Sequence, residues 1–236
     1  MRKQLLAVVL VLATALPAQA DDWVGGLELG FSNTSGNSRD TTLNTRFDLK
    51  YTNEVWQHEL FGDAYYARSD SEKTAERYSL GYKPRKLLSD RDYVFGTLRY
   101  ERDRFSDILA RWTGIGGYGR TVYQSALTEL EAEVGAGMRR TRYDVNPDDL
   151  DSREPILYVG GRFAHQISET AKFVQTLRVE FGRDNTWTES ISSLTLRVTD
   201  SISAKLSHTL RRNSAIEGAR GKKVDQITGV NMVYSF

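Results

Sequence analysis

The chain has 236 residues, of which 32 are basic and 31 acidic, and it contains no cysteine. This near balance of charge argues against the broad basic surface that nucleic-acid binding requires. Without cysteine there can be no disulfide, no thiolate nucleophile and no cysteine-ligated metal.

The first twenty residues have the pattern of a secretory signal peptide. Arg2 and Lys3 precede an apolar run at Leu5–Leu16, and small residues flank the expected cleavage point after Ala20. Cleavage there leaves 30 basic and 31 acidic residues, a net charge of −1. No later apolar run approaches the roughly 20 residues of a membrane-spanning helix. We expect residues 21–236 to form one domain rich in strands and turns.

Four strands are predicted in the first part of the mature chain, because apolar and polar side chains alternate with a period of two. The clearest is 41–51, in which Leu43, Phe47 and Leu49 alternate with polar residues. The other three are expected at 23–32, 55–68 and 75–85.

Eight further strands are predicted by the same alternation, at 92–102, 111–123, 127–140, 155–165, 171–183, 189–199, 203–212 and 224–236. The alternation blurs at Tyr93 and Phe95, which take the polar side of their strand. The strand 111–123 is rich in glycine, which we interpret as a bulge or a close approach of backbones.

The expected connections fall into two classes. Those after odd-numbered strands run six to fourteen residues, and those after even-numbered strands run three to five. This pattern is typical of a membrane barrel with short periplasmic turns and longer extracellular loops. Twelve strands then place both termini on the periplasmic side.

Alternation alone does not distinguish a soluble barrel from a membrane barrel, in which the apolar face is turned outward. Aromatic residues near strand ends, such as Trp23, Tyr51 and Trp56, favour the membrane. Strands of about ten residues suit a tilted membrane span. The last strand carries Tyr234 and Phe236 on one face, which resembles the terminal insertion signal of outer-membrane barrels. We therefore expect an all-β, transmembrane, antiparallel up-and-down barrel, closed by pairing of the last strand with the first.

Three stretches resemble one protein family: WVGGLELGFSNTSGNS at the mature start, RYSLGYKPRKLLSDRDYVFG, and the terminal MVYSF. They are similar to the salt-induced outer-membrane proteins, a family of unknown function in Gram-negative bacteria. The resemblance covers residues 21–236 and implies an outer-membrane β-barrel with a role related to salt or stress. It supplies no catalytic or ligand residues.

If the polar face of each strand lines the lumen, the interior is densely charged with both signs. The residues expected there are Arg46, Asp48, Lys50, Glu59, Asp63, Arg77, Arg99, Glu101, Glu129, Glu131, Glu133, Arg162, Lys172, Arg178, Glu180, Arg197, Lys205 and Arg211. The three glutamates of 129–133 would repel one another unless neighbouring strands supply basic partners, of which Arg162 is one candidate. Two interpretations stay open: a solute path with acidic and basic sides, or an ion-pair network that stiffens the wall.

One loop is a weak candidate for metal binding. Asp144, Asn146 and Asp148 begin like a calcium loop, but Asp149 replaces the glycine at position six and Pro155 replaces the acidic residue at position twelve. A solvated acidic loop is the simpler interpretation.

Catalytic patterns are not evident. His58, His165 and His208 lie on the apolar faces of their strands, and no serine is placed beside a histidine near the outer rim. The G-x-S-x-G motif is also missing.

The leading hypothesis is a non-enzymatic outer-membrane barrel without a cofactor. It would act as a narrow channel for small polar or charged solutes or as an envelope-strengthening protein. The alternatives are an outer-membrane hydrolase of the phospholipase type and a soluble periplasmic ligand-binding barrel. Expected partners are outer-membrane lipid and lipopolysaccharide, with the barrel-assembly machinery during insertion. We expect a monomer and no nucleic-acid partner.

Overall fold

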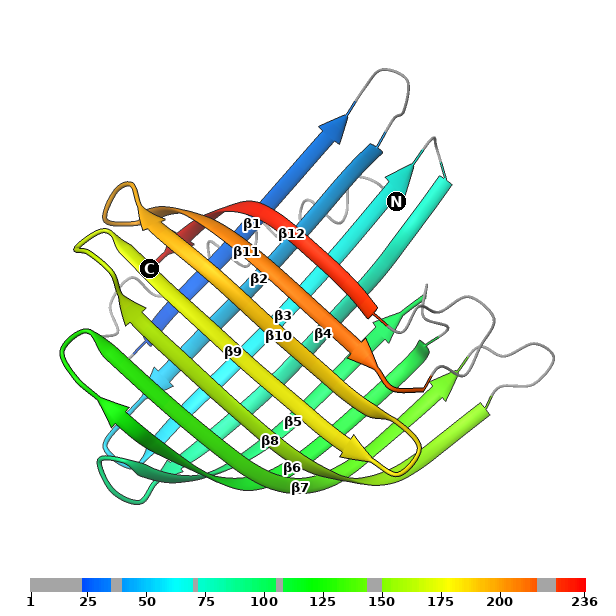
Figure 1. The fold of residues 1–236 in the computed structure, drawn as a ribbon, viewed down its shortest axis with the longest axis horizontal. Coiled ribbons are helices and arrows are strands. Elements are labelled where there is room, and N and C mark those ends of the chain that lie inside the picture. Colours follow the sequence, from blue (N-terminus) through cyan, green and yellow to red (C-terminus); the bar gives the residue numbers. More distant parts are fainter. Residues whose placement is uncertain (1–22, 35–39, 70–71, 105–107, 144–149, 216–223) are drawn as a thin grey trace.

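Twelve antiparallel β-strands form one closed barrel in which each strand pairs with the next and β12 pairs with β1 (Figure 1). The computed structural model describes residues 23–34, 40–69, 72–104, 108–143, 150–215 and 224–236. The strands are β1 (Trp23–Thr34), β2 (Asp40–Thr52), β3 (Trp56–Ser69), β4 (Glu72–Leu87), β5 (Asp92–Asp103), β6 (Ile108–Gln124), β7 (Thr128–Tyr143), β8 (Leu150–Gln166), β9 (Ala171–Gly182), β10 (Thr186–Arg197), β11 (Ile202–Asn213) and β12 (Val224–Ser235). The predicted fold class, strand number and up-and-down order are confirmed.

The predicted division between long and short connections is only partly correct. The turns after even strands are short, as expected, but the connections 70–71, 104–107 and 183–185 after β3, β5 and β9 are equally short. The strands run further than the alternation indicates: β7 reaches Tyr143 and β8 begins at Leu150, inside the predicted acidic loop. Ladder hydrogen bonds can continue beyond the apolar band, where polar residues pair equally well, so the hydrophobic pattern underestimates strand length.

The apolar face of the wall is turned outward and the charged face inward, as in a membrane barrel. Large apolar side chains such as Leu80, Leu98 and Leu157 are exposed on the outside, whereas charged side chains such as Arg99 and Glu180 are buried inside. A soluble barrel has the opposite arrangement. Within the ranges the structure describes, no helix has the length and hydropathy of a membrane span.

Aromatic side chains gather at both ends of the apolar exterior. We call the end with the turns 53–55 and 88–91 and with Phe236 the turn end, and the opposite end the loop end. At the turn end the rings of Trp23 and Tyr51 lie 5.0 Å apart, and His58 stacks on Tyr51. At the loop end Tyr100 lies 4.8 Å from the ring of Trp112. Such rings mark the membrane interfaces of outer-membrane barrels.

The seam between β1 and β12 closes the barrel, as predicted. Its register joins Gly26–Leu29 to Met232–Ser235, and the amide of Gly25 donates to the carbonyl oxygen of Phe236 at 3.0 Å. The ring of Phe236 covers Gly25, where an added Cβ would lie 2.4 Å from a ring carbon. Towards the loop end β1 stays with β2 and β12 stays with β11, and the two strands separate (Figure 1).

A small apolar cluster lies inside the barrel against the glycine-rich wall. It is formed by Tyr93, Phe95, Ile115, Ile156 and Tyr158. A Cβ added at residue 117 or 119 would lie 2.7 Å or 2.3 Å from the inward rings of β5. The glycines of β6 therefore make room for these rings, which explains why the alternation blurs in β5.

Candidate functional site: a charged lumen

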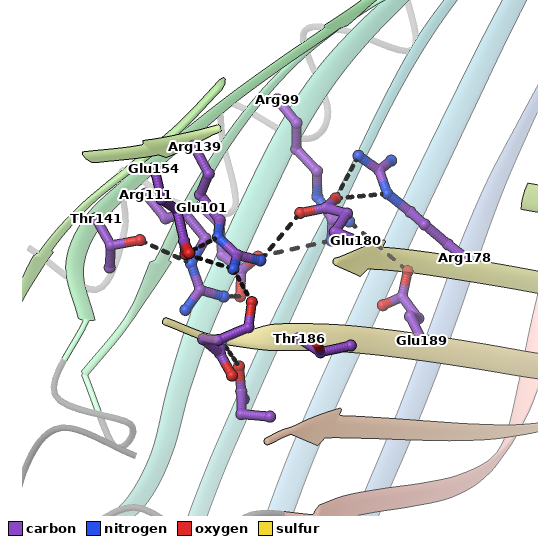
Figure 2. Close-up of polar contacts among 12 residues, drawn as sticks. Arg99, Glu101, Arg111, Arg139, Thr141, Glu154, Arg178, Glu180, Thr186 and Glu189 are labelled. Carbon is purple, nitrogen blue, oxygen red and sulfur yellow. Dashed lines mark hydrogen bonds and ion pairs between the residues drawn. The ribbon is translucent and has the colours of Figure 1, made fainter. Parts of the chain in front are cut away.

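A buried arginine lies at the centre of the ion pairs that fill the lumen near β7–β10. Arg139 is 1% exposed, and its guanidinium donates to Glu154 at 2.6 Å and to Glu180 at 3.4 Å. It also donates to the carbonyl oxygen of Asn185. Glu180 in turn accepts from Arg178 at 2.9 Å (Figure 2). The charges are thus neutralised by more than one partner each, as buried ions require.

Two further ion pairs join strands that are far apart in the barrel. Arg99 on β5 lies 3.7 Å from Glu189 on β10. Arg211 on β11 donates to Glu189 at 2.6 Å and lies 3.8 Å from Asp63 on β3. Since β5 and β10 are not neighbours, and neither are β11 and β3, these ion pairs cross the lumen. The indole of Trp187 supports the crossing, with the Arg99 guanidinium 5.1 Å from its ring.

Glu101 is shared by three arginines. Arg77 lies 3.2 Å from its carboxylate, and Arg99 and Arg111 each lie 3.9 Å away. Arg111 also donates to the hydroxyl of Thr141 at 3.3 Å. This cluster adjoins the crossing pairs (Figure 2).

Glu133 is the acceptor at the centre of a second cluster. Lys83 donates to both carboxylate oxygens at 2.7 Å. The hydroxyls of Tyr93 and Tyr158 donate to it at 2.8 and 2.9 Å. Lys83 lies on β4, three strands away from Glu133 on β7, so this contact also spans the interior.

The other glutamates of β7 have basic partners too. Glu131 accepts from Arg85 of β4 at 3.3 Å, and Glu129 accepts from Arg162 of the neighbouring β8 at 3.1 Å. The sequence indicated Arg162 as a partner. It did not indicate β4, because β4 and β7 are not neighbours in the barrel.

A cavity of about 50 Å³ lies between the two sides of the seam, within the lumen. Glu28, Asn231, Arg46 and Asp63 are among its lining residues. Glu28 pairs with Lys205, and the Asn231 amide donates to Glu28 at 3.4 Å. The cavity is large enough for a few water molecules.

The remaining residues of the expected set lie nearer the turn end. Lys50 lies 4.0 Å from Glu59, and Asp48 lies over Gly26. Arg197 donates to the carbonyl oxygen of Glu169 at 2.9 Å in a turn. Seven further charged residues of the network were not in the expected set: Glu28, Lys83, Arg85, Arg111, Arg139, Glu154 and Glu189. Six of them lie within the predicted strands, where the polar parity is the signal that would have found them, and only Glu154 requires an earlier strand start.

The candidate calcium loop is not tested by the part of the chain that the structure describes. Asp144, Asn146 and Asp148 lie outside the described residues. The nearby Asp151 is an ion-pair partner of Arg140 at 2.6 Å. Among the residues that the structure describes, no group of three or more His, Cys, Asp or Glu side chains is arranged to hold a metal.

The histidines contact hydroxyls of neighbouring strands. His58 lies 2.7 Å from the Tyr82 hydroxyl, and His165 lies 2.8 Å from that of Thr128. His208 lies 2.7 Å from the hydroxyl of Thr228. His208 also faces Ser192 in the register of β10 and β11, and the Ser192 hydroxyl donates to Gln175.

The closed antiparallel wall, apolar outside and charged inside, defines a β-barrel of the outer-membrane type. Within that class, the chain belongs to the family described as "Protein of unknown function, DUF481", whose profile matches residues 27–236. The uncharacterized protein YdiY of Escherichia coli (strain K12) is 28% identical over 211 residues, which cover 89% of this chain and 82% of that protein.

Solved structures of outer-membrane barrels share the fold. The translocator domain of the autotransporter NalP from Neisseria meningitidis has a TM-score of 0.51 at 11% identity, covering 100% of this chain and 96% of that one. The NanC porin has a TM-score of 0.52 at 10% identity, covering 90% and 97%. An outer membrane channel from Pseudomonas putida F1 has a TM-score of 0.51 at 13% identity, covering 94% and 97%. At these identities the likeness establishes the fold alone.

Proposed function

We propose that the chain is a non-enzymatic outer-membrane barrel that acts as a narrow channel, in which an ion-pair network restricts passage to small polar or charged solutes. The observation that carries this proposal is the set of ion pairs across the lumen, above all Arg99–Glu189 at 3.7 Å and Arg211–Asp63 at 3.8 Å. They narrow a lumen that twelve strands would otherwise leave wider than that of a filled eight-stranded barrel.

The network is nearly neutral, which bears on selectivity. Six arginines meet five carboxylates at the crossing: Arg77, Arg99, Arg111, Arg139, Arg178 and Arg211 with Asp63, Glu101, Glu154, Glu180 and Glu189. A solute passing here meets donors and acceptors of both signs. We therefore expect selection by size more than by the sign of the charge.

Planar lipid bilayers test the channel. In the double variant Arg99→Gln/Glu189→Gln a crossing pair is removed while the net charge stays constant, so we expect larger current steps than for the wild type. The control Lys50→Gln/Glu59→Gln removes a pair between the adjacent strands β2 and β3, at 4.0 Å, and should leave the step size unchanged. If neither the wild type nor the crossing variant gives current steps, although a heat-dependent gel shift shows folded barrels, the channel is refuted.

The second candidate is an envelope-strengthening barrel, favoured by the burial of the same network. Here the ion pairs would tie opposite walls together and no solute would pass. The role in salt stress that the family resemblance implies belongs to this candidate. A deletion strain that grows normally at high salt and low osmolarity, with an unchanged envelope, would argue against it.

Location and orientation are part of the proposal. The fold, the apolar exterior and the aromatic interfaces support the outer membrane, with the turn end and both termini in the periplasm. Fractionation tests the first point. The orientation is tested with single cysteines in segment 216–223 and in the turn 125–127, labelled on intact cells with a reagent that does not cross the outer membrane. We expect label at 216–223 alone. Label at 125–127 alone would show that the orientation is the reverse of the proposed one.

A further inference from the structure

A row of four outward side chains crosses β5, β6, β7 and β8 near the loop end. Tyr100 pairs in register with Trp112, Trp112 with Arg140, and Arg140 with Arg153. One half of this row is aromatic and the other half is basic. Arg142, two residues further along β7, pairs in register with Asp151.

The row lies at the boundary of the apolar exterior. On β7 the outward face runs from Leu130 through Val134 to Met138, all exposed, and changes to arginine at 140. On β8 it changes from Leu157 through proline to Arg153. The stretch Leu130–Met138 is about 27 Å long along the strand. At a tilt of roughly 40° it covers about 20 Å of depth, close to the apolar band of about 25 Å in outer-membrane barrels. The arginines therefore lie at headgroup depth.

Among the residues that the structure describes here, positive charge exceeds negative charge. We call Arg102, Arg140, Arg142 and Arg153 the arginine patch. Arg140 donates to Asp151 at 2.6 Å, and Arg153 approaches the same carboxylate at 3.9 Å. One carboxylate thus serves two arginines that face each other directly across the strands, an arrangement that costs free energy unless a further anion is shared.

Arg102 on β5 lies at the edge of the patch, where one terminal nitrogen donates to the Tyr78 hydroxyl at 3.3 Å. An anion beside the patch would supply acceptors for guanidinium groups, which bind phosphate in a bidentate manner.

We propose that the arginine patch binds the phosphate groups of a lipid A molecule in the surrounding outer leaflet, with the rings of Tyr100 and Trp112 beside its sugar and upper acyl region. The proposal rests on the proposed function in one respect, the outward orientation of the loop end. It does not depend on whether the lumen conducts. The lipid is recognised by its membrane-embedded phosphates, which arginines at a membrane surface attract by roughly fivefold in affinity each.

Native mass spectrometry of the full chain in detergent micelles tests the site. The probes are bis-phosphorylated lipid A and the same lipid without phosphates, both in EDTA so that no divalent cation bridges lipid and carboxylate. We expect Arg140→Gln/Arg153→Gln to bind lipid A about 30-fold more weakly than the wild type. The control Arg212→Gln loses one exposed loop-end arginine from β11, three strands away from β8, and should bind as the wild type does.

The outcomes separate the sources of binding. Equal binding by the wild type and the Arg140/Arg153 variant, or equal binding of lipid A with and without phosphates, overturns the proposal. Competition by millimolar inorganic phosphate alone, without a requirement for acyl chains, also overturns it, because the site would then take free anions. If the glutamine variant fails to fold in the gel-shift assay, Arg140→Lys/Arg153→Lys keeps the charge and removes the bidentate geometry; undiminished binding by that variant overturns the proposed phosphate contacts. If a variant that no longer binds lipid A still gives current steps, the lipid site and the channel are independent of each other.

Discussion

Replacing Arg139 by methionine should remove the best-buried charge of the lumen while keeping much of its volume. The guanidinium is 1% exposed and contacts Glu154, Glu180 and the carbonyl oxygen of Asn185. Removing one partner of a buried ion pair leaves the other charge without compensation in a poorly solvated site.

The loss of stability in Arg139→Met depends on which contacts Glu154 and Glu180 keep. Such losses are typically about 3–5 kcal/mol. Glu180 keeps Arg178 at 2.8 Å, and Glu154 keeps the amide of Asp184 at 2.9 Å. Both carboxylates therefore stay partly compensated, and we expect the lower end of the range, about 3 kcal/mol in the free energy of unfolding.

The adjacent residue provides the control. Arg140 points outward, and its side chain is 46% exposed in its pair with Asp151, so Arg140→Met should cost no more than about 1 kcal/mol. Urea titration of barrels refolded into phosphatidylcholine vesicles measures both values, provided that fluorescence and gel shift give coincident transitions. The reasoning is refuted if Arg139→Met loses less than about 1 kcal/mol or no more than the Arg140 variant.

Other substitutions test the packing of the wall and the seam. Gly137→Ala should destabilise the barrel by about 1–3 kcal/mol in the same urea titration, because its Cβ would lie 1.9 Å from a backbone carbonyl oxygen of β6. Gly116→Ala is the control and should be neutral, because nothing lies within 4 Å of its Cβ. Replacing Tyr234 and Phe236 by serine should reduce membrane assembly, measured by fractionation, more than any single lumen substitution; normal assembly would contradict the role of these two rings. Gly25→Val would displace the terminal ring, so it should lower the thermal midpoint of the gel shift, and an unchanged midpoint would show that the ring contributes little to the seam.

The alternation was sufficient for the strands and for which residues share a face, because it is imposed locally by the wall. The aromatic residues near strand ends indicated which face is outward. Glu131 and Glu133 were placed on the polar side by parity alone. Glu154 was missed because it ends an acidic run whose composition suggests a loop, although β8 already begins at Leu150. Strand ends outside the apolar band leave no hydrophobic signature.

The partners in the lumen could not be predicted in the same way. Arg99 and Glu189 belong to strands that are not neighbours, and their contact depends on how the closed wall curves. Many charges share the inward parity, so the pattern does not specify which of them meet. Trp187, which supports this crossing, falls in a segment that the alternation assigns to a connection.

The pair Glu28–Lys205 joins positions 177 residues apart, across the seam. Each hairpin of the barrel can form from contacts that are local in sequence, but this pair must wait until the first and last strands meet. Contacts that form after the folding transition state lower the rate of unfolding and have little effect on the rate of folding. The charges beside the seam therefore have little effect on the rate at which the barrel closes. They mainly slow the separation of the first and last strands during unfolding.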